Sequence, residues 1–119
     1  MVPFGARLRA AMAERGQLCV GIDPHPALLH AWGLGDDPAG LESFALLTVE
    51  AMAGEVAAVK PQSAFFERHG SGGIAVLERV ISAGRDAGLI VILDAKRGDI
   101  GSTVQAYADA YLDHRSPLA

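Results

Sequence analysis

Three continuous apolar runs divide this chain, and a charged residue stands at the end of each. The runs cover residues 18–22, 56–59 and 89–93, and they end at Asp23, Lys60 and Asp94. Short apolar runs of this kind predict parallel strands that are buried on both faces. Asp23 and Lys60 are 37 positions apart, and Lys60 and Lys96 are 36 positions apart. This regular interval is typical of successive strand–helix units.

Apolar residues recur at helical spacing between and around these runs. A leading helix over about residues 3–15 is expected to close the floor of the fold, away from the charged strand ends. A second helix follows Pro38, and a third is expected to end at Gly84 and Gly88. After the third strand, an apolar stripe predicts a fourth helix, with the members Val104, Tyr107, Ala108, Tyr111 and Leu112.

Parallel strands with chemistry at their carboxyl ends predict the α/β fold of a (β/α)8 TIM barrel. A doubly wound sheet is the structural alternative, but no glycine-rich dinucleotide motif follows Asp23. A complete barrel needs about 250 residues, whereas this sequence has 119. We therefore expect residues 1–119 to form a single, incomplete TIM-barrel domain with about three strand–helix units. They would be part of a longer protein, as a fragment or as an incomplete record of it.

The densest group of charges follows the third apolar run. Side chains on a strand alternate between its faces, which predicts that Asp94 and Lys96 point the same way. Asp99 comes three residues later, in the turn before the fourth helix. Because buried charges are costly unless they are paired, this group is a candidate functional site. By the same alternation, Arg97 is expected to point away from Lys96, toward solvent or an interface.

Residues 94–103, DAKRGDIGST, resemble the signature of orotidine 5′-phosphate decarboxylase. The segments CVGIDPHP and VKPQSAFFERHG are similar to the first and second strands of the longer, mycobacterial-type branch of that family. The Asp-x-Lys-x-x-Asp core is also shared by related sugar-phosphate decarboxylases and aldolases that use Mg²⁺, which are the alternative enzymes. A non-catalytic half-barrel is the alternative outside enzymes.

The resemblance implies a carboxy-lyase of pyrimidine biosynthesis that converts orotidine 5′-monophosphate to UMP and CO2 without a cofactor or a metal. It implies catalytic roles for Lys60, Asp94, Lys96 and Asp99, with Lys96 as the proton donor. It further implies that Asp23 binds a ribose hydroxyl, and that Ile100 and Thr103 are substrate-binding. Asp99, Ile100 and Thr103 would enter the site of a partner subunit, so a homodimer is expected. The resemblance implies that the chain is the N-terminal portion of such an enzyme, and the 119 residues alone are expected to be inactive.

Composition and charge indicate which partners and which cellular location to expect. The formal net charge of −4 does not indicate a basic surface that would bind nucleic acid. No apolar run is long enough to cross a membrane, and no secretion signal is evident, so a cytoplasmic protein is expected. The single cysteine, Cys19, is expected to be a small core residue. The four histidines show no metal-ligand spacing.

Overall fold

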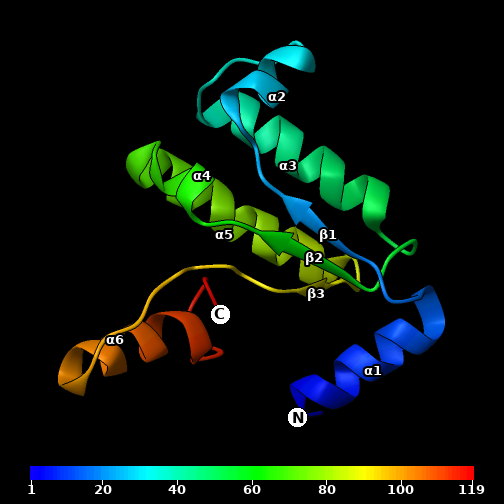
Figure 1. Ribbon diagram of the computed structural model, residues 1–119, viewed down its shortest axis with the longest axis vertical. Helices are drawn as coiled ribbons and strands as arrows, with labels where there is room; N and C mark the ends of the chain where they lie inside the picture. Colours follow the sequence, from blue (N-terminus) through cyan, green and yellow to red (C-terminus); the bar gives the residue numbers. More distant parts are fainter.

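A three-stranded parallel sheet lies at the centre of the computed structural model, which describes all residues from 1 to 119. The strands are β1 (Cys19–Ile22), β2 (Ala58–Pro61) and β3 (Ile90–Val91), and they pair in the order of the sequence (Figure 1). Val59 in β2 lies opposite Val20 in β1 and Val91 in β3. Their carboxyl ends therefore meet at one edge of the sheet.

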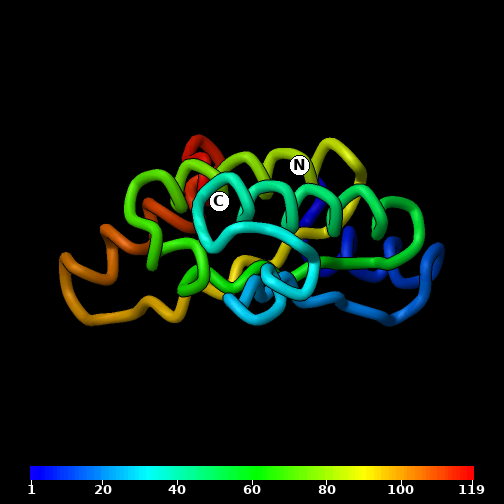
Figure 2. The backbone as a smooth tube through the Cα atoms, turned by 90° about the horizontal axis from the view of Figure 1, so that it is seen from above, coloured from blue at the N-terminus to red at the C-terminus, as the bar shows by residue number.

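Two long helices cover one face of this sheet, as Figure 2 shows from above. They are α3 (Pro38–Met52) and α5 (Gly70–Asp86), which follow β1 and β2 respectively. Both contribute to one buried cluster together with the strands, in which Ile22, Phe44, Val59, Leu77 and Val80 are members. Because α3 and α5, which connect successive strands, lie on the same face of the sheet, the arrangement is that of part of a TIM barrel. A doubly wound sheet would carry helices on both faces.

Helix α5 approaches β3 very closely at Gly84. A Cβ atom placed on Gly84 would lie 2.7 Å from Cγ2 of Val91. The prediction that Gly84 and Gly88 close the helix is wrong for Gly84, because the helix continues to Asp86, and right for Gly88, which follows the C-cap. Gly88, with a φ of 78°, makes the turn that follows.

Helix α1 (Phe4–Arg15) packs against the amino-terminal ends of the strands. Its Ala11 forms a small buried cluster with Ala57, Ala58 and Ile90. Arg15 connects α1 to the segment before β2, because its Nε donates to the carbonyl oxygen of Val56 at 2.9 Å. This confirms the prediction that the leading helix lies away from the charged strand ends (Figure 1).

The remaining helices are short or exposed. They are α2 (Pro26–Ala31), α4 (Ala64–Glu67) and α6 (Gly101–Leu112). Helix α6 has no buried residue, and it lies apart from α3 and α5 (Figure 1). None of the helices is long and apolar enough to cross a membrane.

The face of the sheet opposite α3 and α5 is exposed along β1, which overturns the prediction that this strand is buried on both faces. Cys19 is exposed, so its interpretation as a core residue is wrong. Along β1, Val20 and Ile22 pack toward the helices, whereas Cys19 and Gly21 are exposed on the other face. In a closed barrel that face points toward the interior.

Candidate active site

The carboxylate of Asp94 lies between two ammonium groups at the carboxyl edge of the sheet. Its Oδ2 is 2.5 Å from Nζ of Lys96 and 3.8 Å from Nζ of Lys60. The side chain of Asp94 is 22% exposed, whereas those of Lys60 and Lys96 are 43% and 62% exposed. These are the only two lysines of the chain, and both face the same carboxylate oxygen.

This arrangement keeps Asp94 ionised. The hydrogen bond from Lys96 lowers the pKa of the Asp94 carboxyl, and the charges of Lys96 and Lys60 add to that effect. Partial burial acts in the opposite direction and is outweighed. The result is a negative charge that holds two positive charges close to each other.

The backbone around Asp94 is held by strand pairing. The N–H of Asp94 donates to the carbonyl oxygen of Pro61 at 3.0 Å, and its own carbonyl accepts from the N–H of Ser63 at 3.1 Å. Asp94 is also bridged to Gln62 beyond the regular end of the sheet. Because Lys60 belongs to β2, these bonds fix the positions of Lys60 and Asp94 relative to each other.

Lys96 reaches Asp94 by a different route from the one predicted. Alternation along an extended strand was the basis of that prediction, but Lys96 has a φ of 52° and lies in the left-handed region. A non-glycine residue there costs about 1–3 kcal/mol and persists only where its surroundings impose it. Such strain is concentrated at functional sites.

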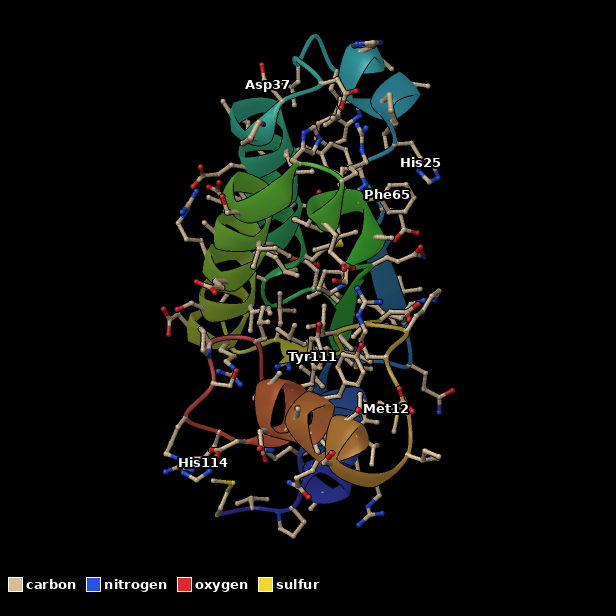
Figure 3. All side chains as sticks on the ribbon, turned by 90° about the vertical axis from the view of Figure 1, so that its left-hand side faces the viewer. Met12, His25, Asp37, Phe65, Tyr111 and His114 are labelled. Atoms are coloured by element: carbon tan, nitrogen blue, oxygen red, sulfur yellow. The ribbon has the colours of Figure 1, made fainter.

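Asp23 follows Ile22 at the end of β1 and carries an unpartnered atom. Its Oδ1 is buried and has no hydrogen-bond partner. A buried carboxylate oxygen without a donor is unfavourable, and a ligand hydroxyl would supply one. The neighbouring His25 lies against Phe65, with ring centroids 4.3 Å apart, and Figure 3 shows the two rings side by side.

Three of the predicted site residues lie elsewhere in this single chain. Asp99, Ile100 and Thr103 stand at the start of α6, and all three are exposed. Oδ1 of Asp99 accepts from the N–H of Ile100 at 2.7 Å, and Asp99 forms no ion pair with Lys96. Ile100 is 83% exposed. The structure therefore brings together Lys60, Asp94 and Lys96, and leaves these three residues facing outward.

An open groove of about 400 Å³ lies between the candidate site and α6. The apolar stripe predicted for that helix lines it, together with the segment from Leu93 to Arg97. A larger hollow of about 770 Å³ lies between α1, β3 and the C-terminal segment, and none of the three charged residues lines it. Asp94 and Lys96 line the smaller groove, whereas Lys60 and Asp23 do not.

Sequence reasoning missed a polar cluster beside Lys96. Glu67 of α4 pairs with Nη2 of Arg97, and its other oxygen accepts from Oγ of Ser63 at 2.8 Å. Ser63 and Glu67 are four residues apart, which places them on one side of a helical turn. That spacing was visible in the sequence, but nothing local indicated that Arg97 was the partner.

Residues 16–116 match the family described as orotidine 5′-phosphate decarboxylase / HUMPS. The chain belongs to this family. Its N-terminal strand–helix units are those of the TIM barrel that the sequence predicted, and the family resemblance is confirmed. A relative from Nocardioides named orotidine 5′-phosphate decarboxylase is 73% identical over the whole chain, which spans 44% of that relative. A relative of the same name from Streptomyces coelicolor is 64% identical over 118 residues, which span 42% of its length.

Solved structures agree with these sequence relatives. A crystal structure of a provisionally named orotidine 5′-phosphate decarboxylase from Streptomyces avermitilis superposes with a TM-score of 0.96. It is 61% identical, and the match covers the whole chain and 42% of that structure. The structure of Leishmania donovani OMP decarboxylase gives a TM-score of 0.77 at 34% identity, with 98% and 42% of the two chains covered. The chain thus spans less than half the length of each of these relatives.

Proposed function

We propose that residues 1–119 supply the charged half of an active site that decarboxylates orotidine 5′-monophosphate to UMP and CO2. The observation that carries this proposal is the Asp94 carboxylate held between the only two lysines of the chain. We infer the substrate from the family, because a relative that aligns with the whole chain carries the name of this decarboxylase.

The reaction breaks the bond between C6 of the pyrimidine and its carboxylate. CO2 leaves, and the bonding electron pair stays on C6, where no neighbouring group can accept it. The ammonium of Lys96 offsets this developing charge and then donates a proton to C6, which gives UMP. Lys96 is left as an amine and regains a proton from solvent. Asp94 orients Lys96 throughout, and Lys60 holds Asp94 from the other side.

The other predicted residues complete the proposal. Oδ1 of Asp23, which is buried and unpartnered, would accept a hydrogen bond from a ribose hydroxyl. Asp99, Ile100 and Thr103 face outward from the start of α6, and this is compatible with a role in the site of a second subunit. We propose a homodimer with shared sites, acting in the cytoplasm.

The test uses a fusion of residues 1–119 to the C-terminal segments of the Nocardioides relative, which we term the completed barrel. Loss of substrate is followed by ultraviolet absorbance. We expect turnover by the parent, and a far larger loss of kcat than of UMP affinity in Lys96→Ala, because the main interaction of Lys96 develops in the transition state. Arg79→Ala is the control, since Arg79 pairs with Glu42 on the helical face.

Two results would contradict the proposal. A Lys96→Ala variant that changes only KM would show that Lys96 is not the proton donor. Activity of the parent that disappears with a chelator, and returns with Mg²⁺, would favour a metal-dependent enzyme of the same superfamily.

A further inference from the structure

Arg97 holds the two peptide groups that flank the strained backbone of Lys96. Its Nη1 lies 3.1 Å from the carbonyl oxygen of Ala95 and 3.4 Å from that of Lys96. The orientation of these two carbonyls sets φ and ψ of Lys96. A single guanidinium therefore contacts both peptide groups of the left-handed turn at φ 52°.

The guanidinium is itself anchored to the second strand–helix unit. Its Nη2 pairs with Oε1 of Glu67, and Oε2 of Glu67 accepts from Oγ of Ser63 at 2.8 Å. Ser63 is 1% exposed, and its N–H donates to the carbonyl oxygen of Asp94 at 3.1 Å. The Ser63–Glu67–Arg97 cluster thus connects α4 to both ends of the segment from Asp94 to Lys96.

We infer that the Ser63–Glu67–Arg97 cluster positions the catalytic lysine, and that Arg97 is a positioning residue for Lys96. Arg97 forms no hydrogen bond or ion pair with Asp94 or Lys60, and its contacts to the lysine turn are to backbone carbonyls, so it acts through the backbone. The cluster imposes the left-handed turn, and the turn brings Nζ of Lys96 to 2.5 Å from Oδ2 of Asp94. An arginine suits this task because its planar fork can contact several oxygens at once, whereas lysine has a single ammonium.

This inference rests on the proposed function, since it concerns the residue that would donate the proton. It predicts a defect in the chemical step, because a misplacement of about 1 Å at a reacting group can cost about 100-fold in rate. Substrate binding depends on other groups and should change little. A cluster with a purely structural role would instead lower stability and leave kcat of the folded enzyme unchanged.

The experiment compares Arg97→Ala with Arg79→Ala in the completed barrel. Arg79 makes a two-fold contact with Glu42, at 2.7 and 2.9 Å, on the far side of α5, so it is a matched arginine–glutamate pair. Arg97→Ala should lower kcat by about 100-fold with little change in KM, and Arg79→Ala should leave both unchanged. Equal kcat in the two variants would overturn the inference.

Chemical rescue provides a second measurement. Guanidinium ion should restore part of the lost kcat of Arg97→Ala, because it can occupy the space between Glu67 and the two carbonyls. Urea, which has a similar shape and no charge, should not. Failure of guanidinium to raise kcat above the urea control would count against the positioning role.

Two further measurements apply if Arg97→Ala does not fold or if the parent is inactive. If Arg97→Ala does not fold, Glu67→Gln removes the charge and preserves an acceptor for Ser63, and it should lower kcat in the same direction; an unchanged kcat would refute the inference. If the parent shows no turnover, the proposed function fails, and a crystal structure of Arg97→Ala decides the positioning role. Lys96 should then leave the left-handed region, and a retained φ near 52° would overturn the inference.

Discussion

Gly84 allows α5 to approach the strand that leads to Asp94. Its Cα faces Val91 in β3, and a Cβ atom there would lie 2.7 Å from Cγ2 of that valine. Atoms of this kind do not approach closer than about 3.5 Å without repulsion. A Gly84→Ala substitution must therefore push α5 away from β3 or displace Val91. Either change would disturb the strand that precedes the candidate site.

Two opposing effects set the size of the stability change caused by Gly84→Ala. Alanine in a helix interior is favoured over glycine by about 1 kcal/mol. Overpacking of a tightly packed core costs about 1–3 kcal/mol. We expect the packing term to exceed the helix term, so that Gly84→Ala destabilises the protein by about 1 kcal/mol. In a barrel of this size, 1 kcal/mol corresponds to a fall in Tm of about 2–4 °C.

The assay is thermal unfolding of the completed barrel, followed by circular dichroism. Gly5→Ala in α1 is the control, because nothing lies within 4 Å of a Cβ atom at that position, so its Tm should not fall. Val91→Ala removes the clashing methyl group, so the double variant should be less destabilised than the sum of the two single variants. A Tm for Gly84→Ala equal to or above that of the parent would refute this account of the helix–strand contact.

Three further outcomes are expected. A completed barrel with Lys96→Ala and another with Asp99→Ala should each be nearly inactive, and activity should return when the two variants are mixed and exchange subunits. If mass spectrometry shows exchange but activity does not return, both residues belong to the site of one subunit. Arg115 lowers the pKa of Asp113 to about 2, so this pair should add stability above about pH 4 that is lost as the pH falls through about 2. The Tm difference between the parent and Asp113→Asn should therefore vanish in acid, and a constant difference would contradict the pairing. Purified residues 1–119 should unfold without cooperativity and show no decarboxylation, because β1 and β3 expose unpaired edges; co-expression of the C-terminal segments should restore both properties, and a cooperative, active chain of 119 residues would overturn this expectation.

The hydrophobic pattern of the sequence predicted the three strands and the four longer helices, but not the short helices α2 and α4. Short apolar runs with charged ends predicted three parallel strands, and helical periodicity predicted α3 and α5 between them. These features are readable because burial on a strand or a helix imposes a fixed period on neighbouring residues. The motif from Asp94 to Thr103 was specific enough to indicate the family. Asp23, Lys60 and Asp94 were placed at one edge of the sheet because they end apolar runs that predicted parallel strands.

Tertiary contacts decided what the local pattern could not express. The left-handed backbone of Lys96 is held by Arg97, whose partner Glu67 is 30 positions away in the sequence. The exposure of Cys19 depends on which face of β1 the helices cover, and both faces have the same period. Gly84 appeared to be a helix end, yet it marks the close approach of α5 to β3. By itself, the sequence determined that Asp23, Lys60 and Asp94 stand at the strand ends, although Asp99, which it placed in the same charged group, lies apart. Only the folded chain decided how Lys96 is turned toward Asp94, because that turn is imposed by contacts between distant segments.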